Sequence, residues 1–152
     1  MKNVLLILSI FLFSFYANGQ NEQINKKKFY DGKFDSQDTT FGYTDAVLAG
    51  NMLYISGTVG NGTIAQQLRR IYTDLGNILK AYGATYQNVV KETLYTTDMD
   101  AVKENNDVRK AFYNNDFPAA TWVQISRLFS SRKDAQIEVD LIACLPVKVR
   151  EK

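Results

Sequence analysis

The chain has 152 residues, a length that suits one domain, and a hydrophobic share of 45% that supports an ordinary folded core. The charged share is 22% and the formal net charge is +2, which argues against disorder and against the concentrated basic face of a nucleic-acid-binding protein. The sequence has no histidine and a single cysteine, Cys144, which excludes an internal disulfide, a cysteine-based zinc cluster and the commonest general base.

The first 19 residues have the three-part pattern of a secretory signal. Lys2 precedes an apolar run over 4–16, and small residues follow at Ala17 and Gly19. An uncleaved membrane anchor is the alternative, but the run is shorter than the ~20 residues that span a bilayer. We therefore expect cleavage after Gly19 and a secreted or periplasmic protein with no membrane attachment. Cys144 follows apolar residues, so we expect this unpaired thiol to be buried.

Residues 20–40 are an N-terminal extension, and we place the domain at 41–152. The triple lysine at 26–28 predicts a solvated, mobile stretch, and 29–40 predicts a loop or a short edge strand. Two β-like runs follow, over 43–49 and 52–59. Because Gly50 and Asn51 between them tolerate positive φ, these runs predict a hairpin.

Two helices and a further strand make up the middle of the chain. Apolar residues at spacings of three and four predict a helix over 63–82, and Gly76 within it would permit close packing against a sheet. The run 87–97 predicts the next strand. Asp98 or Asp100 would cap a second helix over about 101–113, whose buried side we assign to Val102, Val108, Ala111 and Phe112.

Two β-rich runs end the domain, over 121–128 and 135–145, separated by polar residues 129–134. Their period of two predicts half-buried strands, and the short separation predicts an antiparallel hairpin that brings Glu138 beside its partner strand. The predicted order is β-β-α-β-α-β-β, which fits one sheet with both helices on one face. Because the other face stays partly apolar, we expect a closed homo-oligomer to cover it.

Several ordered segments resemble the Rid/YjgF family of reactive-intermediate (enamine/imine) deaminases. The resemblance covers 43–143 and rests on Tyr43 with Ala46-Val47, Gly50-Asn51 leading to Ile55-Ser56-Gly57, the helix 68–83, Val90-Lys91, Asn106 with Ala111-Phe112, Phe117-Pro118-Ala119, and Ile137-Glu138-Val139 with Ile142-Ala143. It implies a chorismate-mutase-like α/β fold, a mixed sheet with two helices on one face. It also implies a homotrimer with a barrel core, small-molecule pockets at the subunit interfaces, and neither a metal nor an organic cofactor.

The resemblance also implies a set of site residues, with one departure. In the family an arginine follows Phe-Pro-Ala and grips the substrate carboxylate, but this chain has Ala120 there, which offers neither charge nor donors. Arg127 matches a second family arginine, and an extended strand places it ~23 Å along the chain from Ala120. Glu138 matches the glutamate expected to activate the hydrolytic water. Its alternative reading is an exposed strand residue paired with Lys133 or Arg132.

The remaining matched positions line the implied pocket. Tyr43 matches a pocket tyrosine, with a strand-edge aromatic as the alternative. Ser56 and Gly57 border the pocket and Asn106 lies near it, although structural roles explain all three equally well. We hypothesise that Trp122, a small residue in many relatives, fills the space left by the lost arginine.

Three functions remain open from the sequence. The first is an exported hydrolase that deaminates an imine, an enamine or a related compound, with activity on 2-imino acids weakened by Ala120. The second is a non-catalytic trimer that binds a small ligand, and the third is a holdase-like protein that reuses the fold.

Overall fold

The computed structural model describes residues 25–29, 40–130 and 133–146. The segment predicted to be a signal sequence, most of the extension, residues 131–132 and the C-terminal tail lie outside these ranges. The elements in chain order are β1 (Lys26–Phe29), β2 (Ala46–Ala49), β3 (Met52–Val59), α2 (Ile64–Ala81), a 3-10 turn (Tyr86–Asn88), β4 (Val89–Thr96), α3 (Met99–Glu104), α4 (Asp107–Tyr113), β5 (Ala119–Gln124) and β6 (Ile137–Cys144). Within the described ranges, no helix is both long and apolar enough to cross a membrane.

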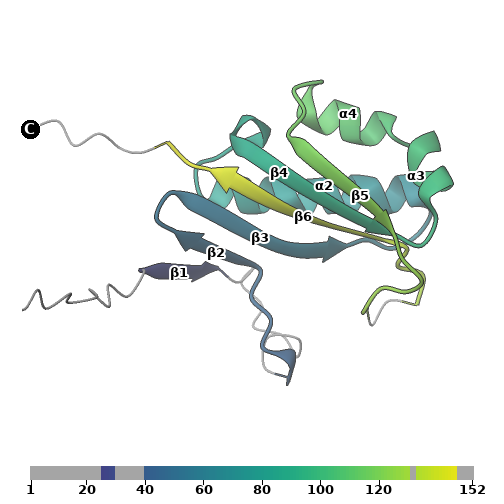
Figure 1. Ribbon diagram of the computed structural model, residues 1–152, viewed down its shortest axis with the longest axis horizontal. Coiled ribbons are helices and arrows are strands. Elements are labelled where there is room, and N and C mark those ends of the chain that lie inside the picture. Colours follow the sequence, from purple (N-terminus) through teal and green to yellow (C-terminus); the bar gives the residue numbers. More distant parts are fainter. Residues whose placement is uncertain (1–24, 30–39, 131–132, 147–152) are drawn as a thin grey trace, which may run out of the picture.

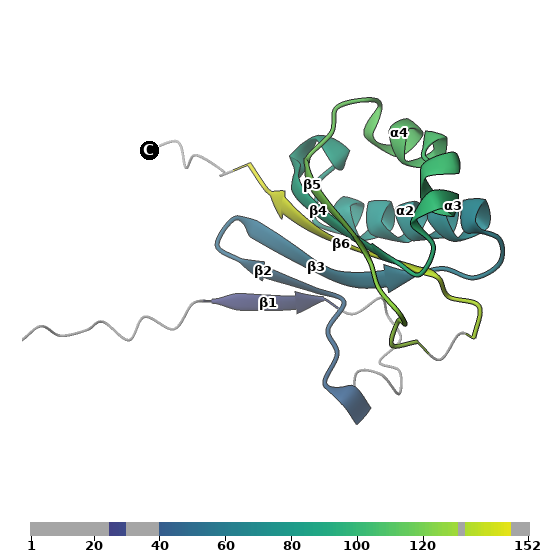
Figure 2. The ribbon, with the colours of Figure 1, turned by 45° about the vertical axis from the view of Figure 1, so that its right-hand side comes forward.

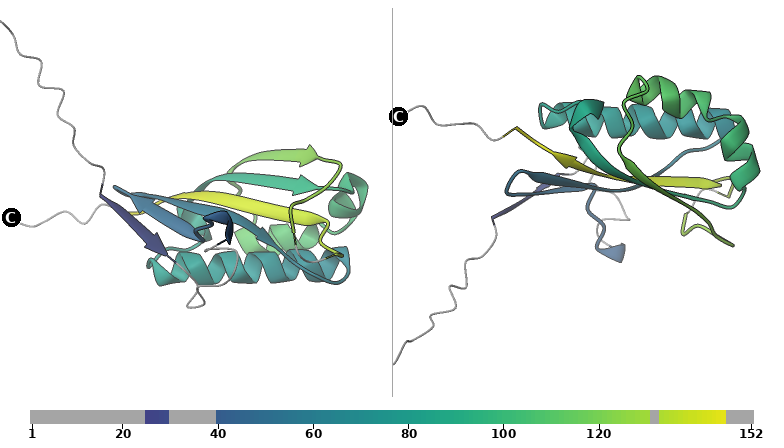
Figure 3. Two further views of the ribbon diagram at one scale, coloured as in Figure 1. Left: turned by 90° about the horizontal axis from the view of Figure 1, so that it is seen from below. Right: turned by 45° about the horizontal axis from the view of Figure 1, so that its top comes forward.

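The strands form one mixed sheet of six in the order β1-β2-β3-β6-β4-β5, with β4 and β5 parallel and the other neighbours antiparallel (Figure 1). The helices lie on one face of this sheet, as the two tilted views make plain (Figures 2 and 3). Among the described residues, no helix covers the opposite face, which we call the open face. This arrangement confirms the predicted α/β fold with the helices on one side.

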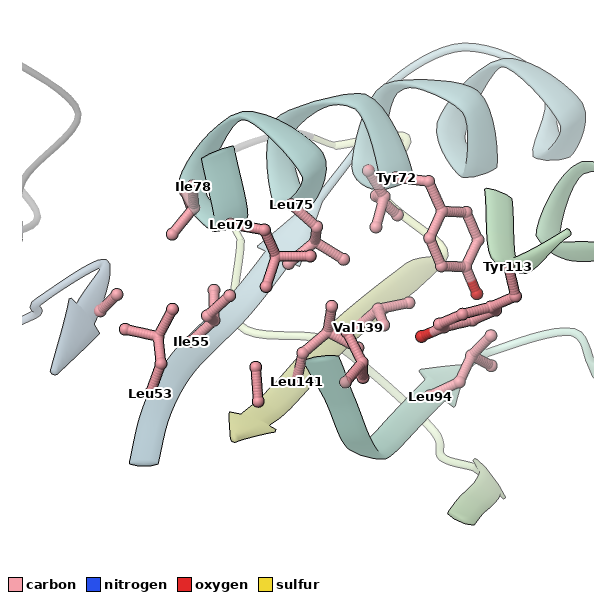
Figure 4. Close-up of a cluster of buried hydrophobic side chains, with 14 of the residues drawn as sticks. Leu53, Ile55, Tyr72, Leu75, Ile78, Leu79, Leu94, Tyr113, Val139 and Leu141 are labelled. Atoms are coloured by element: carbon pink, nitrogen blue, oxygen red, sulfur yellow. The ribbon is translucent and has the colours of Figure 1, made fainter. Parts of the chain in front are cut away.

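The core lies between α2 and the centre of the sheet. Figure 4 shows Leu75 and Leu79 of α2 above Leu53 of β3 and Leu141 of β6, all of which are buried. Burial alternates along β6, where Ile137, Val139, Leu141 and Ala143 face the helices. Glu138 and Asp140 therefore point to the open face.

The first hairpin and the first helix confirm their predictions. β2 pairs antiparallel with β3 around Gly50, whose φ is +63°. The ladder between β3 and β6 shifts register between Ile55 and Thr58, the bulge that contains Gly57. Helix α2 begins with a capping box between Thr63 and Gln66. Gly76 was expected to pack against the sheet, and this was wrong. A Cβ at this position would meet the Phe112 ring of α4 at 3.5 Å.

The second helix is broken into two, contrary to the single helix predicted over 101–113. α3, capped by Asp98, ends at Glu104, and α4 begins at Asp107. Asn105 lies in the break, where its side-chain amide donates to the Ala101 carbonyl at 2.9 Å. The buried face also differs, because α4 buries Arg109 and Tyr113 and leaves Ala111 exposed.

The predicted terminal hairpin was wrong. β5 pairs in parallel with β4, and β4 lies between β5 and β6 (Figure 1). The reason lies in the connections: 125–136 is longer than a hairpin turn, whereas 97–118 contains the helices that a parallel crossover needs. Glu138 consequently pairs with Tyr95 of β4 and Val59 of β3.

The chain's first described strand also departs from prediction. Residues 26–28, expected to be a mobile lysine-rich stretch, form the edge strand β1 against β2 together with Phe29, for which a loop or a short edge strand was expected. Its lysines are exposed, which is a common way of blunting a sheet edge. Cys144, expected to be buried, is only partly buried, and its Sγ accepts the Asn51 side-chain amide at 3.3 Å.

Candidate functional site

Three of the sequence-derived site residues meet at the bulge of β3. The Tyr43 hydroxyl donates a short hydrogen bond to the Gly57 carbonyl. The Glu138 carboxylate lies directly against the backbone of Gly57, so closely that a Cβ at this position would overlap it. The close approach of Glu138 is possible because residue 57 is glycine, and a side chain at this position would displace the carboxylate.

Ser56 holds the neighbouring segment, residues 44–45, in place through two hydrogen bonds. Its hydroxyl donates to the Thr44 carbonyl at 2.6 Å, and its backbone N–H donates to the Asp45 carbonyl at 2.9 Å. Both bonds hold the segment that carries Tyr43 against β3. Ser56 is thus a structural support for the position of Tyr43, the alternative that the sequence left open.

Glu138 is half-buried, and its electrostatic surroundings favour the protonated form. Burial raises the pKa of Glu138 above its usual 4.5, and the neighbouring Asp140 carboxylate raises it further. Burial also raises the pKa of Asp140, against the lowering effects of a Thr93 hydrogen bond and the Lys91 charge. A carboxylate with a raised pKa is the group that general-base chemistry near neutral pH requires.

Ala120 and Trp122 lie on the other side of the sheet. In the parallel ladder they are opposite Glu92 and Leu94, which are buried beneath the helices. The Trp122 indole N–H donates to Glu92 Oε1 at 3.3 Å. Within one chain, Trp122 and Glu138 therefore lie on opposite faces of the sheet, and any space that Trp122 fills is on the helix side.

Glu92 is the centre of a buried polar cluster that the sequence reasoning missed. Its side chain is fully buried, and it accepts hydrogen bonds from Arg109 Nε at 2.7 Å and from the Tyr72 hydroxyl at 3.1 Å. The Arg109 guanidinium lies 5.0 to 5.4 Å from the ring centres of Tyr113, Phe117 and Trp122. Burial, followed by the charge of Glu92, raises the pKa of Tyr72 well above its usual value, which keeps this donor protonated.

The signals for this cluster were present in the sequence. Arg109 follows Val102 and precedes Tyr113 at helical spacings, which places it on the buried side. Glu92, Leu94 and Thr96 are every second residue of β4, so Glu92 shares the buried face of the other two. The two opposite charges at these positions predict each other's burial, because neither is stable there alone.

Asn106 is the residue immediately before α4, on the helix side of the sheet, and its side chain makes no capping hydrogen bond. Its Oδ1 atom is buried and has no hydrogen-bond partner in the part of the chain that the structure describes. Arg127 is exposed at an open hollow of about 580 Å³ whose walls include Gly62, Lys133 and Asp134. The lining of this hollow includes neither Glu138 nor Ala120.

No group of three or more acidic, histidine or cysteine side chains suited to a metal ion occurs among the described residues. The titratable groups at the site are instead a carboxylate pair on the open face and a neutralised ion pair on the helix side. The carboxylate pair can take and return a proton, whereas the ion pair is a buried polar contact between α4 and β4.

The comparisons place the chain in a family. A family model described as Endoribonuclease L-PSP matches residues 35–145. The bovine 2-iminobutanoate/2-iminopropanoate deaminase is 34% identical over 110 residues, covering 66% of this chain and 78% of that protein. The human protein of the same name is 31% identical over the same shares.

Solved structures agree. A YjgF-family protein from Neisseria meningitidis is 26% identical with a TM-score of 0.68, covering 82% of this chain and 98% of that one. Rv2704 from Mycobacterium tuberculosis, of the YjgF/YER057c/UK114 family, shares the fold with a TM-score of 0.72 at 24% identity, covering 80% of this chain and 100% of that one. With a family model that spans β2 to β6 and neighbours that share this sheet and these helices, the chain belongs to the Rid/YjgF family.

Proposed function

We propose that the protein hydrolyses the C=N bond of a small imine, or of the imine formed from an enamine, and releases ammonia and a carbonyl compound. The observation that carries this proposal is the half-buried Glu138 carboxylate, held against Gly57 beside Tyr43, with its pKa raised. The relatives named 2-iminobutanoate/2-iminopropanoate deaminase support the same reaction type.

The chemistry assigned to Glu138 is general-base catalysis. As the ionised carboxylate it takes a proton from a water molecule while the water oxygen bonds to the C=N carbon. It then returns this proton to the nitrogen of the tetrahedral intermediate. Glu138 then takes the hydroxyl proton and passes it to the amino nitrogen, so that the C–N bond breaks, ammonia leaves and the hydroxyl oxygen becomes the carbonyl oxygen. The net reaction consumes one water and needs no cofactor.

We propose further that the pocket is completed between subunits of a homotrimer. Tyr43, Gly57 and Glu138 form one half on the open-face side, whereas Ala120 and Trp122 lie on the helix side, so one chain does not bring the two halves together. The open face also carries apolar area, including Tyr54 at 47% exposure. Association of this face with other copies would cover it.

The assembly can be tested at the centre of the open face. Ile142 pairs with Tyr54 there, so Ile142→Asp would place a charge in the proposed interface. Sedimentation should give a trimer for the unaltered protein and a smaller species for this variant. A monomeric unaltered protein would contradict the assembly and the shared pocket.

Export of the mature protein is a proposal from the sequence. Mass spectrometry of the protein recovered from its native type of host should find a chain that begins at Gln20. An intact N-terminus in a membrane fraction would instead support the anchor.

Two alternatives are set against hydrolysis. A non-catalytic, ligand-binding or holdase-like trimer would keep the fold, and the loss of a family arginine at Ala120 favours it.

Cleavage of RNA is the second alternative, because the matched family model is described as an endoribonuclease. Against that activity, Glu138 and Asp140 put two carboxylates on the candidate face, where they would repel RNA phosphates.

The deciding experiment measures ammonia release from imines generated in the assay, some with a carboxylate and some without. Glu138→Gln keeps the shape of the side chain and removes the base, so we expect turnover to fall by about 10²-fold or more. Glu104→Gln, on an exposed turn of α3, is the matched control and should leave turnover unchanged. No hydrolysis above buffer for any imine would leave the binding function in place of the enzyme.

A further inference from the structure

The carboxylate of the Glu92–Arg109 pair comes from the residue of β4 that lies opposite Ala120, near the start of β5. Glu92 is the ladder partner of Ala120, and its Oε1 accepts from both Arg109 and Trp122. The guanidinium is thus linked to the position of Ala120 only through Glu92, and its charge is already paired. Arg109 is only 7% exposed.

The aromatic rings around Arg109 strengthen this arrangement. The rings of Tyr113, Phe117 and Trp122 surround the guanidinium and exclude water from it. In such surroundings the attraction between the paired charges is weakly screened, so a second anion would have to displace Glu92. The helix-side half of the site therefore offers aromatic surface and no uncompensated positive charge.

The other half of the proposed pocket is unfavourable to anions for a separate reason. Glu138 and Asp140 share the open face at alternate positions of β6. The cation on this face, Lys91, donates from Nζ to Thr121 Oγ1 and partly offsets Asp140. A protonated C=N group would be stabilised beside these carboxylates, whereas a substrate carboxylate would be repelled.

We propose that Glu92 sets the charge selectivity of this pocket: by pairing with Arg109 at the ladder position opposite Ala120, it restricts the site to small apolar aldimines and ketimines that carry no carboxylate. This inference rests on the proposed hydrolysis for its reaction and names the substrate class. Trp122 and Phe117 supply the surface for an alkyl or aryl substituent. Glu92 acts through Arg109 and is a specificity-determining residue, not a catalytic one.

The test compares two imines with the same carbon skeleton, 2-iminobutanoate made by an amino acid oxidase and the imine of butan-2-amine made by an amine oxidase. The unaltered protein should favour the neutral imine in kcat/KM by about a hundredfold, the effect of a buried charge without its partner. Glu92→Gln keeps the acceptor for Arg109 and removes the negative charge. We expect it to shift the ratio at least tenfold toward 2-iminobutanoate, and Glu92→Gln with Arg109→Gln to abolish that shift.

A binding measurement separates this inference from the proposed reaction. In calorimetry, 2-oxobutanoate should bind Glu92→Gln and bind neither the unaltered protein nor the double variant. If no imine is hydrolysed but this pattern holds, the reaction fails and the selectivity stands. Equal binding to the unaltered protein and Glu92→Gln would overturn the selectivity, as would a preference of the unaltered protein for 2-iminobutanoate.

Lys91 provides the competing explanation, since its charge acts on Asp140 of the carboxylate pair. If the unaltered protein binds 2-oxobutanoate and Lys91→Met abolishes that binding, Lys91 is the anion-binding group and the assignment to Glu92 is wrong. The preference of the unaltered protein for neutral over anionic imine requires no variant, so the inference stays testable even where Glu92→Gln does not fold.

Discussion

Replacing Gly57 with alanine tests whether the position of Glu138 matters for catalysis. A Cβ on residue 57 would lie 2.6 Å from Cδ and 2.8 Å from Cγ of Glu138, closer than such atoms approach in proteins. The carboxylate must therefore rotate away from the backbone. Because Glu138 is flexible and half-exposed, this rotation is inexpensive, and we expect the free energy of unfolding to fall by only about 1 kcal/mol.

Turnover should fall much further than stability. A displacement of a reacting group by ~1 Å costs about a hundredfold in rate, and the rotation moves the Glu138 oxygens by at least that much. The assay is kcat/KM for ammonia release, with unfolding in urea measured on the same preparations. A Gly57→Ala protein with unaltered turnover would refute the reasoning, as would a loss of turnover that only follows the loss of folded protein.

Gly76→Ala is the matched control for this experiment. Its Cβ would meet Phe112 at 3.5 Å, which is an ordinary contact, and residue 76 lies inside α2. Alanine should stabilise the helix by about 1 kcal/mol relative to glycine and leave turnover unchanged. The two glycines thus separate a close approach at the site from a general effect of adding a methyl group.

Four further predictions concern charged groups. Glu92→Ala leaves Arg109 buried without its partner and should lower the free energy of unfolding in urea by about 3–5 kcal/mol; a loss below 1 kcal/mol would mean that water reaches the guanidinium. The native pKa values of Glu138 and Asp140 are raised, so the folded state binds more protons and stability falls as pH rises through the window above about 4.5. Asp140→Asn should reduce that fall and move the acidic limb of the rate profile to lower pH, because it removes a charge that opposes ionisation of Glu138; an unmoved limb would assign it to another group. Ala120→Arg alone should give little activity on 2-imino acids, since Glu92 would pair with the new guanidinium, and a full gain without Glu92→Gln would contradict this.

The local signals in the sequence predicted most of the elements but not all of their partners. The Gly50-Asn51 turn and the stripe of α2 are local patterns, and the structure confirms both. The partner of β5 is not a local property, since the alternation of Val123 and Ile125 indicates a strand without saying which strand lies beside it. Topology was decided by the helices of 97–118, which allow β5 to return parallel to β4.

The site shows the same division. Family motifs located Tyr43, Gly57 and Glu138, and the structure brings these three together. Family motifs do not include Glu92 and Arg109, whose only signals in the sequence are the alternation along β4 and the helical spacing around Arg109. That these two residues form one ion pair depends on the packing of α4 on β4, which only the folded chain supplies.

The charges on the two sides of the sheet explain why a single substitution cannot account for this site. Loss of an arginine at Ala120 would leave an apolar gap, but Glu92, the ladder partner of Ala120, is paired with the guanidinium of Arg109. If anion binding had simply been lost, nothing would require a fully buried carboxylate to face that guanidinium, at a desolvation cost of several kcal/mol. The pair is better understood as holding α4 to the β4–β5 edge while denying the site a free cation. Activity toward a carboxylate-bearing substrate should therefore depend on removing the charge of Glu92 as much as on supplying a new arginine.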